Sequence, residues 1–145
     1  MPALTPKVVR QVVLTCVSLF AVTASYADIA VVVHPANTSN LDKNAIERIF
    51  MGKANNFDNG RAALPINAAK GATTREIFNT AVIGRSDAQV NAYWSKLLFT
   101  GKGTPPKELA TDQDIIANVA ANEDAIGYVD AAAVTSAIKV VATFQ

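Results

Sequence analysis

A segment in the middle of the sequence combines small residues, hydroxyl groups and positive charge, which together suit the binding of an anion. Glycine and alanine let a ligand approach the backbone, and the free N–H groups at the start of a helix attract negative charge. Threonine hydroxyls donate hydrogen bonds, and the planar fork of an arginine matches the oxygens of a tetrahedral oxyanion. The candidate ligand-binding residues of this segment are Asn67, Lys70, Gly71, Ala72, Thr73, Thr74 and Arg75.

Two further hydroxyl residues, Thr38 and Ser39, lie in a polar loop after the first predicted strand, and we expect them to line the same edge as this segment. The local chemistry also has a purely structural interpretation. A helix that begins with threonine and carries a surface lysine and arginine is common in proteins that bind no anion. The residue types alone leave both interpretations open.

Residues suited to catalysis are sparse. The only histidine, His34, precedes a proline at a predicted strand end, and no serine lies in a nucleophile-elbow pattern. The only cysteine, Cys16, lies in an N-terminal apolar run, so the rest of the chain has no thiol nucleophile and no cysteine-based metal site. Two pairs of acidic residues stand at helix ends without a histidine beside them. We therefore predict no catalytic residue, no metal site and no cofactor.

Residues 1–27 have the three parts of a cleavable secretory signal. Lys7 and Arg10 give a positive start, and an apolar stretch of about 13 residues follows, shorter than the roughly 20 that a membrane-spanning helix needs. Ser25 and Ala27 are the small residues that a signal peptidase reads. We therefore expect export to a periplasm, removal of residues 1–27 and no membrane span in the domain that remains. An N-terminal membrane anchor is the alternative.

The remaining residues, 28–145, suffice for one domain with one hydrophobic core. The chain has 13 basic and 12 acidic residues, and two of the basic residues belong to the expected signal. The domain is therefore close to neutral. This charge excludes the basic surface of a nucleic-acid-binding protein.

Strands and helices alternate along the domain, which indicates an α/β fold with helices packed on a mixed, mostly parallel sheet, in a three-layer-like arrangement. The continuous apolar run Ile29–Val33 predicts a strand buried on both faces. A capping residue at Asp42 and capping boxes at Ser86 and Thr111 mark helix starts. We expect strands at 29–33, 63–66, 125–129 and 138–142, helices beginning near 42, 73, 86 and 111, and a short helix or turn at 131–135.

Three segments, in order, resemble the substrate-binding protein of phosphate ABC transporters, which is a type II periplasmic binding protein. Residues 41–53 resemble the family's helix that ends in IF-x-GK, and residues 64–78 resemble its strand, anion loop and helix, written EGSGTR-x-x-F. Residues 125–129 resemble its AIGYV strand. Together these segments span nearly the whole of the chain after residue 27, and the order and spacing of IF-x-GK and AIGYV are fairly specific.

The sequence departs from this family in two respects. All the matching segments belong to the family's second lobe, so the chain resembles one half of a clamp that closes on its ligand. The anion loop is also altered, because Ala72, Thr73 and Lys70 replace the family's serine, second glycine and acidic residue, and its upstream arginine is absent. Thr74 and Arg75 match the motif directly.

The resemblance implies a periplasmic, non-catalytic, one-lobe protein that binds phosphate or a similar oxyanion, with an ABC transporter, a sensor or a second copy as candidate partners. A single lobe leaves the anion partly in water, where each exposed charge pair contributes only about 0–1 kcal/mol. We therefore expect weak binding, with a free energy of about −4 to −6 kcal/mol. The alternative is a periplasmic protein-interaction module that has kept this fold and lost ligand binding.

Overall fold

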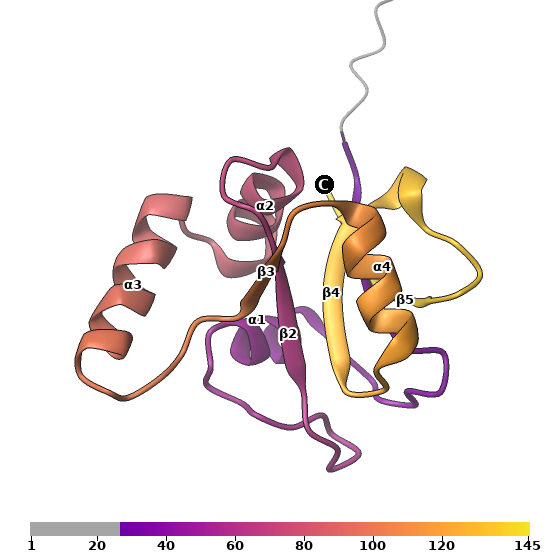
Figure 1. Ribbon diagram of the computed structural model, residues 1–145, viewed down its shortest axis with the longest axis horizontal. Coiled ribbons are helices and arrows are strands. Elements are labelled where there is room, and N and C mark those ends of the chain that lie inside the picture. The colour runs from indigo at the N-terminus through magenta and orange to yellow at the C-terminus, as the bar shows by residue number, and fades with distance from the viewer. Residues whose placement is uncertain (1–26) are drawn as a thin grey trace, which may run out of the picture.

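The computed structural model describes residues 27–145, which place helices on both faces of one five-stranded sheet (Figure 1). The strands are β1 (Ile29–Val33), β2 (Leu64–Ala68), β3 (Lys107–Leu109), β4 (Ala125–Asp130) and β5 (Lys139–Phe144). The helices are α1 (Lys43–Phe50), α2 (Thr73–Phe78), the π turn η1 (Asn79–Ile83), α3 (Asp87–Phe99), α4 (Asp112–Ala121) and the 3-10 turn η2 (Ala131–Ala133). Apart from Ala27, the predicted signal peptide lies outside the described residues. Within 27–145, no helix is long and apolar enough to cross a membrane.

The sheet has the strand order β3-β2-β4-β1-β5. Strand β2 pairs in parallel with β3 and β4, whereas β1 pairs antiparallel with β4 and β5. The predicted α/β fold with a mixed sheet is confirmed. Parallel pairings do not predominate, however, because β1 runs against both of its neighbours. The apolar run of β1 predicts burial on both faces but carries no information on strand direction.

One continuous core fills the space between the sheet and its helices. All residues of β1 are at most 2% exposed, as predicted. On one face the rings of Phe78 and Tyr128 stack with centroids 4.1 Å apart, and the ring of Phe50 lies 4.6 Å from that of Phe78. On the other face α4 packs over Gly127, where a Cβ would lie 2.7 Å from Ile115. Glycine at this position therefore lets α4 approach the sheet closely.

Three helix starts follow the predicted capping chemistry. The carboxylate of Asp42 accepts an N–H bond in the first turn of α1 at 2.7 Å. Ser86 and Gln89 exchange both bonds of a capping box at the start of α3. At the start of α4 the hydroxyl of Thr111 accepts from the N–H of Asp114, so this end has a threonine cap rather than the predicted reciprocal box.

The sequence pattern misses two features of this fold. Strand β3 is short and begins with the polar pair Lys107 and Glu108, so it carries no periodic signal. The helix predicted to begin near residue 73 changes after Phe78 into the π turn η1, which Gly84 follows with φ +72°. A change in helix type depends on packing in three dimensions and leaves no mark on apolar spacing.

Helix α3 extends outward from the sheet (Figure 1). Val90 and Trp94 are buried, whereas Leu98 and Phe99 at its end are 58% and 92% exposed. The ring of Trp94 lies against Gly52, where an added Cβ would be 2.8 Å from it. The first half of α3 is therefore anchored to the body of the protein, and its second half faces solvent.

Candidate functional site

The segment predicted to bind an anion lies at the carboxyl-terminal edge of the sheet. Strands β2, β3 and β4 are parallel, so their carboxyl ends meet at this edge, where open α/β sheets bind ligands. The chain leaves β2 at Ala68, turns at Gly71 and enters α2 at Thr73. Gly71 has φ +83° and open space where a Cβ would point, and Lys70 beside it is exposed. The backbone of this turn is therefore accessible to a ligand.

The first turn of α2 supplies two N–H groups for which the described residues offer no acceptor. The N–H groups of Arg75 and Glu76 both donate to the carbonyl of Ala72, at 3.1 and 3.2 Å. The N–H groups of Thr73 and Thr74 donate to no carbonyl within residues 27–145. The structure thus brings the predicted loop and helix start together and leaves these two N–H donors without an acceptor in the described chain.

Asn67 belongs to β2 rather than to the loop, and it is 7% exposed. Its Oδ1 accepts from the hydroxyl of Tyr128 at 2.6 Å, and that hydroxyl accepts from the N–H of Ala68 at 3.1 Å. Burial raises the pKa of Tyr128 well above its ordinary value, so the phenol keeps the proton that it donates. These bonds fix the carboxamide of Asn67 at the entrance to the loop.

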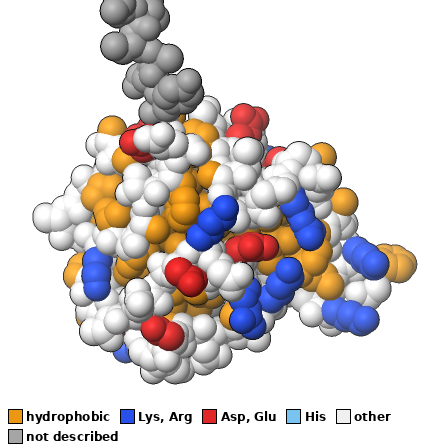
Figure 2. All heavy atoms as spheres, turned by 180° about the vertical axis from the view of Figure 1, so that it is seen from behind, with side chains coloured by type: hydrophobic (Ala, Val, Ile, Leu, Met, Phe, Trp, Pro, Cys, Tyr) orange, Lys and Arg blue, Asp and Glu red, His pale blue; other side chains and the backbone are white. Residues whose placement is uncertain are grey.

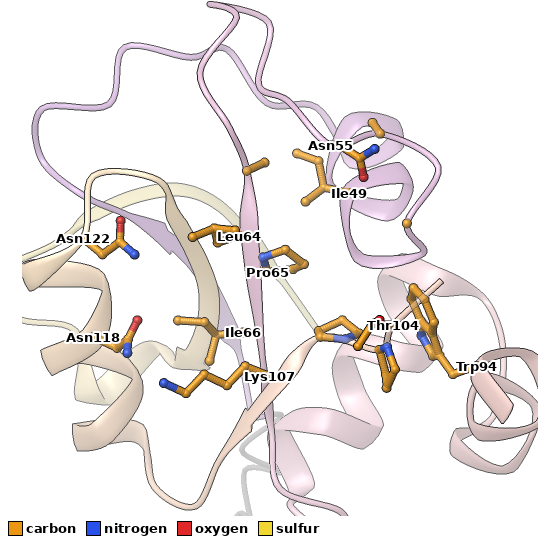
Figure 3. Close-up of a pocket in the computed structure, with 15 residues that line it drawn as sticks. Ile49, Asn55, Leu64, Pro65, Ile66, Trp94, Thr104, Lys107, Asn118 and Asn122 are labelled. Atoms are coloured by element: carbon orange, nitrogen blue, oxygen red, sulfur yellow. The ribbon is translucent and has the colours of Figure 1, made fainter. Parts of the chain in front are cut away.

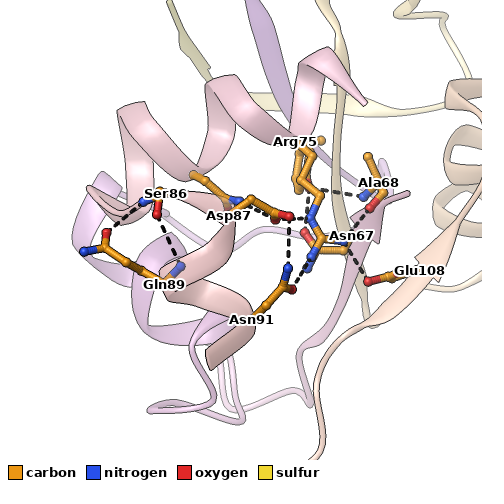
Figure 4. A network of polar contacts seen from close by, with 10 residues as sticks. Asn67, Ala68, Arg75, Ser86, Asp87, Gln89, Asn91 and Glu108 are labelled. Atoms are coloured by element: carbon orange, nitrogen blue, oxygen red, sulfur yellow. Dashed lines mark hydrogen bonds and ion pairs between the residues drawn. The ribbon is translucent and has the colours of Figure 1, made fainter. Parts of the chain in front are cut away.

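Arg75 is not free to contact a ligand in the way the sequence suggests. Its side chain is 3% exposed, and its Nε and Nη1 lie 2.7 Å from the carboxylates of Asp87 and Glu108. The guanidinium also donates to the carbonyl of Ala68 at 3.0 Å and to Asn91 at 3.1 Å (Figure 4). Arg75 therefore joins α2 to the end of β2, to α3 and to β3, and we interpret it as a positioning residue.

Arg75 and Asp87 stabilise each other in their charged forms, and Glu108 also stabilises the charged form of Arg75. Burial acts to lower the pKa of Arg75, but hydrogen bonds and charges from Glu108 and Asp87 outweigh it and raise that pKa. Burial likewise acts to raise the pKa of Asp87. The hydrogen bond and charge of Arg75, together with bonds from Asn91 and Asn79, outweigh it and hold the pKa of Asp87 below its ordinary value. Both partners are therefore charged at neutral pH.

Thr38 and Ser39 lie at the opposite end of the sheet, so the prediction that they line the same edge is wrong. Strand β1 runs antiparallel to β4, which places the loop after Val33 where β2 and β4 begin. Thr38 is exposed, whereas the buried Oγ of Ser39 has no hydrogen-bond partner in this part of the chain. The length of the sheet separates both residues from Lys70.

Within residues 27–145, no group of three or more histidine, cysteine, aspartate or glutamate side chains is placed to hold a metal ion. His34 has a local structural contact, because its Nδ1 accepts from the N–H of Ala36 at 3.0 Å. This bond closes the turn that follows β1.

A pocket of about 410 Å³ lies around the amino-terminal end of β2 (Figure 3). Leu64, Pro65 and Ile66 line it from the strand, and Trp94 lines it from α3. Its polar groups are mainly carboxamides, with Lys107 as the cation. This pocket is at the other end of β2 from the loop, so it does not contain the predicted anion site.

On the face seen in Figure 2, acidic side chains lie toward the centre and the top, whereas basic side chains gather toward the right. Apolar side chains with basic neighbours project at the right edge of this view, which corresponds to the left side of Figure 1, where α3 lies. The exposed apolar residues of that helix are Leu98 and Phe99.

A family model described as a PBP superfamily domain matches residues 18–143. The chain belongs to the PBP superfamily. No curated protein matches the sequence. The match covers most of the sheet and the loop described above, so the predicted periplasmic-binding-protein relationship is confirmed at the level of the superfamily.

Three solved structures share the fold of this PBP-superfamily domain. One is a phosphate ABC transporter substrate-binding protein from Clostridium perfringens, solved with bound phosphate. It has a TM-score of 0.64 and 21% identity, covering 79% of this chain and 45% of its own. An ABC-type phosphate transport receptor from Vibrio cholerae has a TM-score of 0.60 and 17% identity, covering 79% of this chain and 46% of its own. PstS from Borrelia burgdorferi has a TM-score of 0.59 and 10% identity, covering 80% and 47%. The chain therefore spans less than half of the length of these relatives, as the one-lobe resemblance predicts.

The PBP-superfamily domain also contains residues that the sequence did not single out for this site. Tyr128 orients Asn67, and Asp87, Asn91 and Glu108 hold Arg75. Glu108 lies 33 positions along the chain from Arg75, in a strand that the pattern does not predict. Only Tyr128, the fourth residue of the AIGYV motif, gave a signal that could have been used, because the hydroxyl of a buried tyrosine needs a polar partner.

Acid is expected to weaken this fold through Asp87. An aspartate in an unfolded chain titrates near about 3.9, and Arg75 holds the folded pKa of Asp87 lower than its ordinary value. The resulting stability is fully present above the unfolded pKa and is lost as the pH falls through the folded pKa. Urea unfolding at about pH 7 and about pH 3 should show a steeper loss for the wild type than for Asp87→Asn. Equal losses in the two proteins would contradict this role.

Proposed function

We propose that this PBP-superfamily domain is a non-catalytic periplasmic protein that binds phosphate or a similar oxyanion at the loop from Lys70 to Thr74. The observation that carries the proposal is the pair of N–H groups of Thr73 and Thr74, which lack acceptors in the described chain and lie at the carboxyl edge of the sheet. The superfamily and the bound phosphate of the Clostridium perfringens relative support it. In this proposal residues 1–27 direct export.

Each group near the loop has a distinct role in the proposed site. Lys70 supplies the exposed positive charge, and the turn at Gly71 opens the backbone to the ligand. Thr73 and Thr74 donate from N–H and hydroxyl groups. Arg75 acts from behind the loop, because its bond to the last carbonyl of β2 fixes where the loop begins.

Binding to this single lobe is expected to be weak. The loop is open to water on one side, and exposed charge contacts contribute only about 0–1 kcal/mol each. Dissociation constants from roughly tens of micromolar to millimolar follow, which correspond to about −4 to −6 kcal/mol. A second copy, a sensor or an ABC transporter that covered the loop would exclude water and strengthen these contacts.

Thr73→Pro is expected to weaken phosphate binding about tenfold or more, because a hydrogen bond to a charged group contributes about 1.5–3 kcal/mol. Proline removes the N–H and the hydroxyl at the first helical position, where it is well tolerated. Ala72 already has the extended backbone, φ −69° and ψ 135°, that a residue before proline prefers. Thermal melts with phosphate titrated at constant ionic strength give the dissociation constant, because a ligand of the folded state raises stability by RT ln(1 + [L]/Kd).

Thr73→Ala is the matched control, since it removes the hydroxyl but keeps the N–H. It should lose less affinity than Thr73→Pro, and Lys70→Gln should lose affinity through charge alone. A phosphate response that survives Thr73→Pro unchanged, or a flat wild-type curve up to roughly tens of millimolar phosphate, would rule out the proposed oxyanion site.

One observation favours a second function, that of a protein-interaction module. Phe99 is 92% exposed and Leu98 is 58% exposed at the end of a helix that extends from the sheet. Adjacent exposed apolar residues with basic neighbours are typical of contact surfaces. This function becomes the preferred one if the wild-type phosphate titration is flat.

A further inference from the structure

A smaller pocket, of about 190 Å³, lies beside the proposed oxyanion loop. It is bounded by the end of β2, the outward helix α3 and the edge strand β3. The residues that line it on the loop side are Asn67, Lys70 and Arg75, and apolar residues that line it include Trp94, Leu98 and Pro105. The pocket therefore combines cationic and amide groups with an apolar wall.

The polar part of this pocket contains a side-chain donor without an acceptor in the described chain. The Oδ1 of Asn67 accepts from the hydroxyl of Tyr128, so Nδ2 is the end of the amide left to donate. Asn67 as a whole is 7% exposed, but its Nδ2 is not among the fully buried atoms that lack a partner within residues 27–145. This nitrogen is therefore open to the pocket, where a ligand or water can accept from it. Lys70 lines the same pocket and can supply the matching positive charge.

The apolar part of the pocket continues along β2. Trp94 and Pro105 line both this pocket and the pocket of about 410 Å³ at the amino-terminal end of the strand (Figure 3). Pro65 and Asn67 are two positions apart, so they lie on the same face of β2. The two pockets therefore adjoin in one trough, which is polar beside Asn67 and apolar beside Pro65.

Glu108 restricts what the trough can accept. Its carboxylate also lines the smaller pocket, 2.7 Å from the Nη1 of Arg75 (Figure 4). Glu108 is the register partner of Asn67, so this carboxylate lies at the polar end of the trough, where its ion pair with Arg75 offsets its charge. Lys70 is the further cation at this end, so the polar end suits one anionic group rather than two.

The space exceeds what inorganic phosphate needs. A volume of about 190 Å³ is several times the roughly 30 Å³ that one water molecule occupies. Phosphate held at Lys70 would leave Trp94 and Pro105 uncovered.

We propose that the preferred ligand is an organic phosphoryl or phosphonyl anion whose head accepts from Asn67 Nδ2 and Lys70 and whose aromatic or alkyl substituent lies against Trp94 and Pro105. This proposal rests on the oxyanion site proposed above and names its ligand class; the two share Lys70, whereas Thr73 and Thr74 lie outside the lining of the smaller pocket. The substituent buries apolar surface that inorganic phosphate cannot bury, so it adds affinity without adding charge.

Phenylphosphonate and inorganic phosphate, titrated separately into the purified protein, test this ligand class. Trp94 is the only tryptophan of the chain, so its fluorescence reports directly on the pocket wall. We expect phenylphosphonate to bind about tenfold tighter than phosphate and to change the emission of Trp94. Thermal melts in the same ligands give an independent dissociation constant.

Ser95→Phe, which fills the pocket from the exposed face of α3, should remove the advantage of phenylphosphonate and leave the response to phosphate. Ala92→Phe is the control, because Ala92 is exposed on the same helix and does not line the pocket. If phosphate binds but phenylphosphonate is no tighter, the ligand class is wrong and the oxyanion site stands. If neither ligand binds, both proposals fail. An advantage of phenylphosphonate that survives Ser95→Phe would also overturn the inference.

Discussion

Replacing Arg75 by methionine is expected to lower the free energy of unfolding by about 2–4 kcal/mol. Methionine fills much of the same volume but makes none of the hydrogen bonds by which the guanidinium joins α2 to β2, α3 and β3. Removing one partner of a fully buried ion pair costs about 3–5 kcal/mol. The expected value is smaller because the side chains of Asp87 and Glu108 are 30% and 41% exposed, so water can solvate their carboxylates.

Urea unfolding followed by Trp94 fluorescence and by circular dichroism measures this loss. Arg48→Met is the matched control, since Arg48 is exposed in the last turn of α1. Its removal should cost no more than about 1 kcal/mol, the size of an exposed interaction with a helix end. If the two variants lose the same stability, the network around Arg75 does not hold these elements together.

Arg75→Lys separates charge from geometry. Lysine keeps the positive charge, but its single ammonium cannot reach both carboxylates, the carbonyl of Ala68 and Asn91 in the planar pattern of the fork. If Arg75→Lys recovers part of the unfolding free energy lost in Arg75→Met, we interpret that part as the contribution of charge alone. The part that is not recovered measures the geometric role of the guanidinium, which connects the start of α2 and the end of β2 to α3.

The features that the sequence predicts correctly depend on neighbours close in the chain. The side-chain oxygens of Asp42, Ser86 and Thr111 cap their helices by accepting from N–H groups three positions away, so their residue types suffice. The turn and the helix start that follow β2 are equally local, because Gly71 and the threonines after it determine them. Anion binding by this segment stays a prediction. The spacing of apolar residues likewise predicts β1 and β4, whose residues are almost completely buried.

The features that the sequence does not predict depend on distant partners. Arg75 has the chemistry of an anion ligand, and only the placement of Asp87 and Glu108 shows that two carboxylates of the chain already occupy it. The predicted position of Thr38 and Ser39 is wrong for a similar reason. Their position depends on the direction of β1 in the sheet. The apolar pattern of a buried strand does not indicate whether the strand runs parallel or antiparallel to its neighbours.

Tyr128→Ala is expected to cost about 3–5 kcal/mol of unfolding free energy, the usual loss for a large aromatic residue in a core. The side chain is completely buried, stacks on Phe78 and lies 5.7 Å from Phe50 between ring centroids. Alanine would leave a cavity at the centre of this aromatic cluster, where α1, α2 and β4 meet.

Tyr128→Phe divides this effect into packing and hydrogen bonding. Phenylalanine keeps the stacked ring but leaves the Oδ1 of Asn67 and the N–H of Ala68 without the hydroxyl, which should cost about 1–3 kcal/mol. Equilibrium unfolding of both variants gives the two shares, and an equal cost for Phe and Ala would refute the packing argument. The carboxamide of Asn67 is also free to rotate in Tyr128→Phe, so phenylphosphonate affinity should fall although Tyr128 does not line the pocket. A folded Tyr128→Phe protein with unchanged affinity would mean that Asn67 does not donate to the ligand.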